Sequence, residues 1–209
     1  MTNAKPAFVF GDLETTGLEE LSDVILEAAF IITDIELGII AEKSWLILET
    51  GWRQALSHAS EFVQDMHRDN GLTAELNALE AEGNHNNDLV TVANDIFMWL
   101  FTNEVPLPEM PLSGSTIGFD RKFLAEKMPN VNSLFHYRSI DVSSVKELCR
   151  RWNPNVYEHY QKTYGSAKKA HRALPDARAS VQELEFYCNE FLLVDVIGEI
   201  PGQEVINLP

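Results

Sequence analysis

Residues 8–18 read FVFGDLETTGL, and this stretch near the start of the chain decides the fold. Its three apolar residues predict a short buried strand, and Gly11 allows another part of the chain to approach closely. Asp12 and Glu14 are two positions apart, so on a strand their side chains point to the same face. The TTG at 15–17 supplies turn chemistry that ends the strand there. An acid pair after a buried strand favours a functional site, although in a chain with 32 acidic residues it can also be an ordinary loop pair.

Two further segments carry acids beside short apolar runs. Residues 115–120 read STIGFD and end on Asp120, whereas residues 170–176 read AHRALPD and contain His171 and Asp176. Asp176 follows a proline and precedes a long amphipathic pattern. We therefore expect it in the first turn of a final helix, where the helix dipole favours a carboxylate. Such strand and helix ends can deliver all of these side chains to one cleft.

Four converging carboxylates repel one another unless cations lie between them. Their oxygen atoms are the ligands that Mg²⁺ or Mn²⁺ prefers, and four of them balance the charge of two divalent ions. Two such ions roughly 3.5–4 Å apart can hold both the attacking and the leaving oxygen of a phosphodiester displacement. Histidine changes its charge near neutral pH, so His171 suits the removal of a proton from the attacking water. The pattern predicts a metal site that contains Asp12, Glu14, Asp120 and Asp176.

The apolar pattern predicts an α/β protein without internal repeats. Runs at 7–13, 24–33 and 39–49 predict three strands in a meander, and short strands are expected at 112–115 and around Ile140. Helices are predicted at 60–67, 73–82, 88–101 and 119–128. A further helix is expected to begin at a cap formed by Asp141 or Ser143 and to run to Trp152, and a long final helix is expected to follow Pro175.

The composition describes one globular domain. The chain has 209 residues, of which 45% are hydrophobic, and this length can bury a substantial core. No apolar run approaches the roughly 20 residues that cross a bilayer, and residues 1–6 show no signal or transit pattern. Cys149 and Cys188 lie in helical patterns without metal-like spacing, which predicts free thiols in a reducing compartment. We therefore expect a cytoplasmic protein with no membrane partner.

The net charge of −16 bears on the kind of substrate. Proteins that hold long nucleic acids through their phosphates need a basic stripe, and this chain has only 16 Lys and Arg residues. The charge therefore favours a substrate with very few phosphates over long duplex nucleic acid. Acidic charge that only maintains solubility is the alternative explanation, and charge alone does not choose between them.

The motifs together resemble a known family. Asp-x-Glu near the start, a central Asp and His-x₄-Asp near the end form the pattern of the DEDDh 3′-to-5′ exonucleases. The chain is most similar to the oligoribonuclease branch, because the similarity also includes specific stretches of sequence. These stretches are residues 12–18, 25–34, 113–124 and 135–152, the last of which contains the His-Tyr-Arg run that general DEDDh exonucleases do not share.

The resemblance implies an RNase H-like fold, in which a mixed five-stranded sheet is flanked by helices. It covers roughly residues 7–192, so we expect an exonuclease domain at 1–193 and a C-terminal extension at 194–209. It also implies hydrolysis of dinucleotides and very short oligoribonucleotides to 5′-mononucleotides by two ions, Mg²⁺ or Mn²⁺. The four acids match the family's metal ligands, and His171 matches its catalytic base.

Further positions match family residues that bind a very short RNA. Leu18 matches a leucine that wedges against the bases, and Tyr137 matches an aromatic that stacks on a base from the partner subunit of a homodimer. Arg138 and Ser143 match a cap around the substrate's 5′-phosphate, and Arg suits this role because its fork donates two hydrogen bonds. The remaining substrate-binding candidates are Phe62, His67 and Thr116.

The chain departs from the family pattern at several positions. Ser115 replaces an amide residue, Phe62 stands where the family has a tryptophan, and Asn70 stands in place of a serine. An insertion of about five residues lies within 157–169, and its residues Lys162, Lys168 and Lys169 either contact substrate phosphate or form a solvated loop, which we favour.

Two other functions remain open from the sequence. The first is a DEDDh exonuclease that acts on longer single-stranded DNA or RNA, in the manner of a proofreading enzyme. Tyr137 and Arg138 argue against it. The second is a catalytically inactive protein that captures dinucleotides. The five intact catalytic positions argue against that function.

Overall fold

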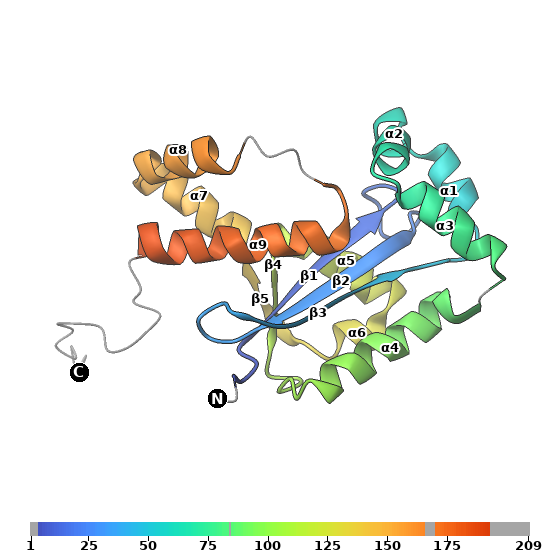
Figure 1. The fold of residues 1–209 in the computed structure, drawn as a ribbon, viewed down its shortest axis with the longest axis horizontal. Helices are drawn as coiled ribbons and strands as arrows, with labels where there is room; N and C mark the ends of the chain where they lie inside the picture. Colours follow the sequence, from blue (N-terminus) through green and yellow to red (C-terminus); the bar gives the residue numbers. More distant parts are fainter. Residues whose placement is uncertain (1–3, 84, 166–169, 193–209) are drawn as a thin grey trace.

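The computed structural model describes residues 4–83, 85–165 and 170–192, and it contains one five-stranded sheet in the order β3-β2-β1-β4-β5 (Figure 1). The strands are β1 (Phe8–Thr15), β2 (Ile25–Thr33), β3 (Ile39–Leu46), β4 (Pro111–Gly114) and β5 (His136–Asp141). The first three strands form the predicted antiparallel meander, and β4 and β5 run parallel to β1. The prediction of a mixed five-stranded sheet flanked by helices is confirmed.

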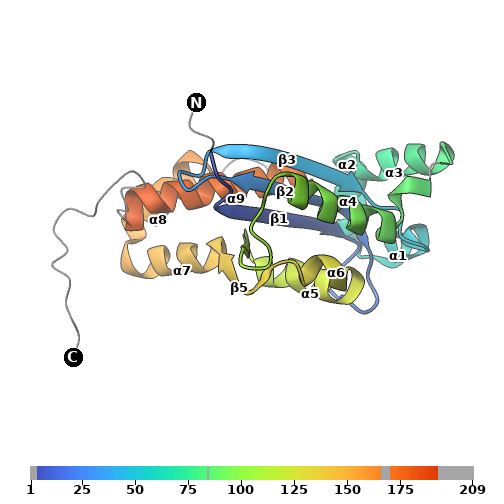
Figure 2. The same cartoon turned by 90° about the horizontal axis from the view of Figure 1, so that it is seen from below.

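Helices cover both faces of the sheet (Figures 1 and 2). The helices are α1 (Trp52–His58), α2 (Glu61–Asp69), α3 (Leu72–Ala81), α4 (Leu89–Thr102), α5 (Ile117–Lys127), α6 (Pro129–Asn132), α7 (Val142–Trp152), α8 (Pro154–Thr163) and α9 (Ala173–Tyr187). Helix α9 and the start of α7 pack on one face, and α4, α5 and α6 pack on the other. Helices α1 and α3 cover the end of the sheet where β1 finishes.

The side chains of β1 alternate between these two layers. Phe10 packs with the residues of α9, whereas Val9 and Leu13 belong to the core beneath α4 and α5. The even-numbered side chains that follow Phe10, which include Asp12 and Glu14, therefore face the α9 side. This alternation places the first acid pair between the middle of the sheet and the start of α9.

The structure differs from the helix predictions at three places. Helices α1 and α6 were not predicted, and the segment 157–169, where an insertion was expected, starts within helix α8, which extends to Thr163. The side chain of Asn153 accepts a hydrogen bond from the backbone N–H of Val156, so it caps α8. Lys162 lies in this helix and pairs with Glu158 at 3.6 Å, in agreement with a solvated role. Lys168 and Lys169 lie outside the described residues.

Several local predictions agree with the structure. The Asp141 side chain accepts a hydrogen bond from the Ser143 backbone and caps α7, and Asp176 lies in the first turn of α9. Cys149 and Cys188 are free thiols. Among the described residues, no helix combines the length and apolar character that crossing a membrane requires. The expected extension at 194–209 lies outside the described part of the chain, so the division into a domain and an extension stays a prediction.

Candidate active site

The site forms where β1 extends beyond its neighbour β4. Within β1, only Val9 and Phe10 pair with β4, and β1 then continues to Thr15. Gly11 lies at this transition, where an added Cβ atom would meet the Phe30 ring at 3.0 Å and the Leu112 side chain at 3.2 Å. The predicted close approach at Gly11 is confirmed, and it holds the first acid pair against a tightly packed core.

Three of the predicted metal ligands lie together. Asp12 and Glu14 on β1 and Asp176 on α9 each place one carboxylate oxygen within 4.8 Å of the other two. Glu14 is buried, whereas Asp12 and Asp176 are partly accessible. Three carboxylates at this separation form a hard-oxygen donor set that suits a divalent cation. The side chains present therefore fit a divalent metal centre.

Asp120 reaches the site from the edge of β1. It lies in the first turn of α5, is 5% exposed, and its Oδ1 accepts a hydrogen bond from the backbone N–H of Leu13 at 2.9 Å. Because β4 has already ended, this carboxylate satisfies a β1 donor that has no strand partner on that side. Asp120 is not part of the three-carboxylate cluster, so its role as a metal ligand stays a prediction.

The site concentrates negative charge in a poorly solvated place. Burial, together with the neighbouring Asp176 and Glu27, raises the pKa of Glu14 to about 8, although Arg172 opposes this shift. Burial also raises the pKa of Asp120 to about 7. Both shifts show that ionisation costs free energy here, and a bound divalent cation would offset that cost.

These pKa values predict how stability depends on pH in the absence of metal. The folded protein binds protons more tightly than the unfolded chain at Glu14 and Asp120, so their stabilising contribution is complete below about pH 4. This contribution to the free energy of unfolding is lost as the pH rises through about 7 for Asp120 and about 8 for Glu14. Each group loses up to about 1.4 kcal/mol per pH unit. We expect the melting temperature in chelator to fall between pH 5 and pH 9, and added Mn²⁺ to reduce that fall.

The matched control for this pH effect is Glu14→Gln, which removes one of the two titrating groups. Thermal unfolding of this variant in chelator should show a weaker pH dependence than the wild type. A wild-type melting temperature that rises with pH in chelator would contradict the assigned shifts.

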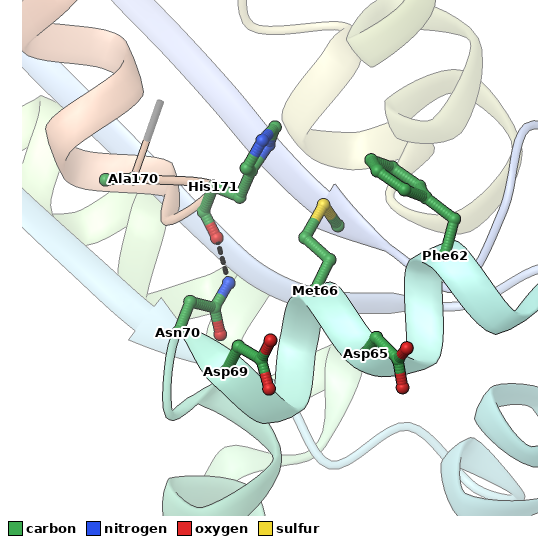
Figure 3. A pocket seen from close by; sticks show the side chains of 7 residues that line it. All are labelled: Phe62, Asp65, Met66, Asp69, Asn70, Ala170 and His171. Carbon is green, nitrogen blue, oxygen red and sulfur yellow. Dashed lines mark hydrogen bonds between the residues drawn. The ribbon is translucent and has the colours of Figure 1, made fainter. Parts of the chain in front are cut away.

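His171 lies opposite α2, near the side chains of Phe62 and Met66 (Figure 3). It precedes α9 by two residues, and its ring makes an edge contact with the Phe62 ring at a centroid distance of 6.5 Å. A cavity of about 490 Å³ opens between these rings, lined by Phe62, Asp65, Met66, Asp69, Asn70, Ala170 and His171. The structure thus brings the predicted base and the predicted aromatic contact to one cavity.

A second cavity contains two of the clustered carboxylates in its lining. It has a volume of about 510 Å³, and Asp12, Asp176 and Thr116 are among its lining residues, together with Lys146 of α7. The Thr116 and Ser143 hydroxyl oxygens are 3.0 Å apart, and the backbone N–H groups of both residues donate to Asp141. Two of the predicted substrate-binding residues therefore share one locality at the rim of the site.

The other predicted substrate-binding residues lie in different settings. Leu18 is 72% exposed in the loop after β1. Tyr137 and Arg138 are exposed on the edge strand β5, where the guanidinium lies 5.2 Å from the Tyr137 ring, and they line neither of the two cavities. Within one subunit they remain apart from these cavities, so their proposed contact with substrate stays a prediction.

His67 is fully buried beneath the end of β1. Its Nε2 donates to the carbonyl of Thr15 at 2.9 Å, and its Nδ1 lies 3.9 Å from a Glu14 carboxylate oxygen. Burial lowers the pKa of this ring below its ordinary value. The described contacts of His67 are with β1, and a direct contact with substrate stays a prediction.

The sequence analysis did not single out Glu27 and Arg172. Glu27 lies opposite Glu14 in the pairing of β1 with β2, and Arg172 forms an ion pair with it at 2.9 Å. A signal was present, because Glu27 is the one charged residue in the apolar run 25–33. A buried carboxylate of this kind requires a partner.

Comparison with known proteins agrees with the fold and identifies a family. The RNase T exonuclease family model matches residues 9–184. The oligoribonuclease of Cutibacterium acnes is 37% identical over 192 residues, which cover 91% of this chain and 88% of the relative. The oligoribonuclease of Mycobacterium leprae is 40% identical, with coverage of 86% and 78%, and that of Pseudoalteromonas atlantica is 39% identical, with coverage of 86% and 92%.

Solved structures show the same fold at lower sequence identity. The zinc-bound complex of E. coli exonuclease I with single-stranded DNA has a TM-score of 0.58 and 17% identity. The match covers 90% of this chain and 41% of that protein, and at this identity it bears on the fold alone. The family match and the curated relatives are decisive: this chain belongs to the oligoribonuclease family of exonucleases.

Proposed function

We propose that this protein is a 3′-to-5′ exoribonuclease that degrades dinucleotides and very short oligoribonucleotides to 5′-mononucleotides. The observation that carries the proposal is the convergence of Asp12, Glu14 and Asp176 within 4.8 Å. Asp12 and Asp176 line one cavity, and His171, five residues before Asp176, lines another. Oligoribonucleases 36–40% identical to this chain support the choice of short RNA as substrate. The free cysteines suit a cytoplasmic site of action.

The proposed metal ligands are Asp12, Glu14, Asp120 and Asp176, which would hold two Mg²⁺ or Mn²⁺ ions. Bound ions of this kind supply stabilisation of the charge that develops on the attacking and leaving oxygens. Asp120 also holds β1 through the Leu13 backbone, which keeps the first acid pair in place. The pKa of about 8 applies to Glu14 in the metal-free site, so Glu14 would lose its proton when a metal ion binds.

His171 would act as the general base. Its imidazole accepts a proton from water while the water oxygen attacks the phosphorus of the last phosphodiester. The bond between phosphorus and the 3′ oxygen of the preceding nucleotide breaks, and that oxygen leaves as a 3′ hydroxyl after protonation. The terminal residue departs as a 5′-mononucleotide. The side chain is partly accessible and lines an open cavity, so water can reach it.

The substrate would span the two cavities. Both volumes lie within the range of small-molecule sites, which suits one nucleotide in each cavity. Phe62 and Leu18 offer exposed apolar surface to the bases, and Thr116 and Ser143 offer hydroxyl groups to a 5′-phosphate. A net charge of −16 disfavours long strands and long duplexes, because few cations are available for their phosphates.

Product analysis on a ladder of two to about ten nucleotides, in RNA and in DNA, tests this function. We expect the dinucleotide to be cut faster than a heptanucleotide, and mononucleotides carrying a 5′-phosphate to be the product. The reaction should stop in chelator and resume with Mn²⁺ or Mg²⁺. Trimming of long single strands as readily as dinucleotides would replace this function with that of a general DEDDh exonuclease. Binding without cleavage at saturating metal would indicate a capture protein.

We also propose a homodimer in which Tyr137 and Arg138 of one subunit complete the site of the other. Their exposure on the edge strand β5 and their absence from the linings of these two cavities support this arrangement. Mixing Asp12→Ala protein with Tyr137→Ala protein should restore activity, because one site of the hybrid dimer then has both residues intact. Cleavage rates of the mixture and of each variant alone provide the measurement.

The matched control for this mixing experiment combines Asp12→Ala with Asp120→Ala. Every site of that hybrid lacks one proposed ligand, so no activity should return. An active monomer at the assay concentration, or recovery in the control mixture, would contradict completion of the site by a partner.

A further inference from the structure

His171 has a backbone conformation that needs external support. Its φ angle is 49°, in the left-handed region that residues other than glycine seldom adopt. Such a conformation costs of the order of 1 kcal/mol or more and persists only where surrounding contacts enforce it. The residues that enforce it also decide where the imidazole points.

One set of contacts comes from the junction of α2 and α3. The Asn70 side-chain amide donates a hydrogen bond to the carbonyl oxygen of His171 (Figure 3). The amide oxygen of Asn70 accepts from the backbone N–H of Leu72 at 2.9 Å, which fixes the orientation of the side chain. Asn70 therefore joins a rigid helix junction to the backbone of the proposed base.

The second set of contacts begins one residue later. Arg172 donates from Nε to Glu27 Oε2 at 2.9 Å and from Nη2 to Glu27 Oε1 at 3.2 Å. It also donates from Nη1 and Nη2 to the two carboxylate oxygens of Glu75, at 2.9 and 2.7 Å. The backbone N–H of Ala173 donates to the same Glu27 at 3.1 Å. One guanidinium thus connects strand β2, helix α3 and the start of α9.

The surroundings of the Arg172–Glu27 ion pair favour a fixed geometry. Glu27 is 3% exposed, so its carboxylate is compensated by the Arg172 and Ala173 donors rather than by water. A bidentate ion pair between a guanidinium and a carboxylate fixes the relative orientation of the two groups as well as their distance. The hydrogen bonds that Arg172 donates to Glu75 and Glu27 raise the pKa of Arg172 above its ordinary value, so the residue stays charged.

We propose that Asn70 and Arg172 are positioning residues that hold His171 from both sides, Asn70 through its carbonyl oxygen and Arg172 through Glu27 and Glu75. The inference rests on the proposed role of His171 as general base. Neither residue touches the reacting atoms, and both act through the His171 backbone. Loss of either contact releases the strained residue and lowers the fraction of molecules in which the imidazole faces the water.

Kinetics of the variants Asn70→Ala and Arg172→Lys, each with and without His171→Ala, test this inference. Arg172→Lys keeps a cation beside Glu27 but loses the fork, so the buried carboxylate is not left without a positive neighbour. With a dinucleotide at saturating Mn²⁺, we expect each single variant to lower kcat by about 10-fold to 100-fold, as for other residues that orient a site. KM should change by less than about threefold, because substrate contacts remain.

The double variants separate positioning from a general structural role. If Asn70 and Arg172 act through His171, their substitution in the His171→Ala protein should lower kcat by less than about twofold further. Losses that multiply in that background would overturn the inference. Arg178→Ala is the matched control, since Arg178 lies on α9 and pairs with Glu42 on β3, away from His171. Its kcat should equal that of the wild type.

Hydrogen exchange gives a readout that does not depend on the reaction. The backbone amides of residues 171–174 and 176 should exchange faster in Asn70→Ala and Arg172→Lys than in the wild type or in Arg178→Ala. Unchanged exchange in both variants would overturn the inference even if the enzyme is active. A wild type that does not cleave dinucleotides would overturn the proposed function instead, and faster exchange in the variants would still support the two-sided contact.

Discussion

Replacing Asp12 with alanine is expected to reduce dinucleotide cleavage to the background of the uncatalysed reaction while leaving the fold intact. Asp12 is the partly accessible member of the β1 acid pair, and its carboxylate lies within 4.8 Å of those of Glu14 and Asp176. Removing it takes away a ligand on which the charge stabilisation of both reacting oxygens depends. Initial rates measured over a range of Mn²⁺ concentrations, with far-ultraviolet circular dichroism of the same protein, provide the test.

The stability of the Asp12→Ala protein separates a catalytic loss from an unfolded protein. Because the change removes one of several mutually repelling carboxylates, the melting temperature in chelator should stay at or above the wild-type value. Glu158→Ala is the matched control, since this exposed acid of α8 pairs only with Lys162 among its described ion pairs. Turnover like that of the wild type in Asp12→Ala at low metal concentration would refute the assignment of the site.

Asp120→Ala should also abolish cleavage, but it is expected to destabilise the protein. The change leaves the Leu13 backbone N–H without its buried acceptor, at a cost of about 1–3 kcal/mol. Its kinetics must therefore be measured well below its melting temperature. A lower melting temperature for Asp120→Ala than for Asp12→Ala would reflect this difference between the two carboxylates.

The central part of the fold was predictable because its sequence signals are local. Apolar runs identified β1, β2 and β3, and the two-residue spacing of Asp12 and Glu14 placed both acids on one face. The proline before Asp176 located the start of the last helix to within a few residues. Each of these predictions depends on neighbouring residues, so no knowledge of distant packing was required.

Helix α8 shows what was missed and why. Its start carries a helix signal, an asparagine cap followed by Pro154. Its apolar face is narrow, because only Tyr160 is buried, and that face packs against Tyr187 at the end of α9. A short polar segment of this kind has a weak periodic signal, and the comparison with the family pattern made it look like an inserted loop.

The contacts that organise the site depend on tertiary structure. Asp120 bonds to Leu13 only because β4 ends early and leaves that donor exposed to α5. Glu27 and Arg172 are 145 positions apart in the chain, so no local pattern relates them. The sequence alone indicated which groups to expect at the site, whereas the contacts that orient these groups required the folded chain.

Replacing His171 with alanine is expected to lower kcat by about 10²-fold to 10⁴-fold, the usual contribution of a positioned general base. Dinucleotide binding should survive much better than turnover, because the Phe62 side of the cavity and the carboxylate cluster are unchanged. The defect should shrink as the pH rises, since hydroxide then replaces the water that the imidazole would deprotonate. Steady-state kinetics between pH 6 and pH 9, combined with equilibrium binding of a dinucleotide, measure both effects.

The comparison variant for His171 is His159→Ala, which removes an exposed histidine of α8 whose ring lies beside Phe186 and not beside the carboxylates. Its turnover should match the wild type at every pH. A general base acts on the chemical step alone, so the loss in His171→Ala must appear in kcat rather than in affinity. If affinity collapses while kcat at saturation is unchanged, His171 contributes to binding, and another group must accept the proton of the attacking water.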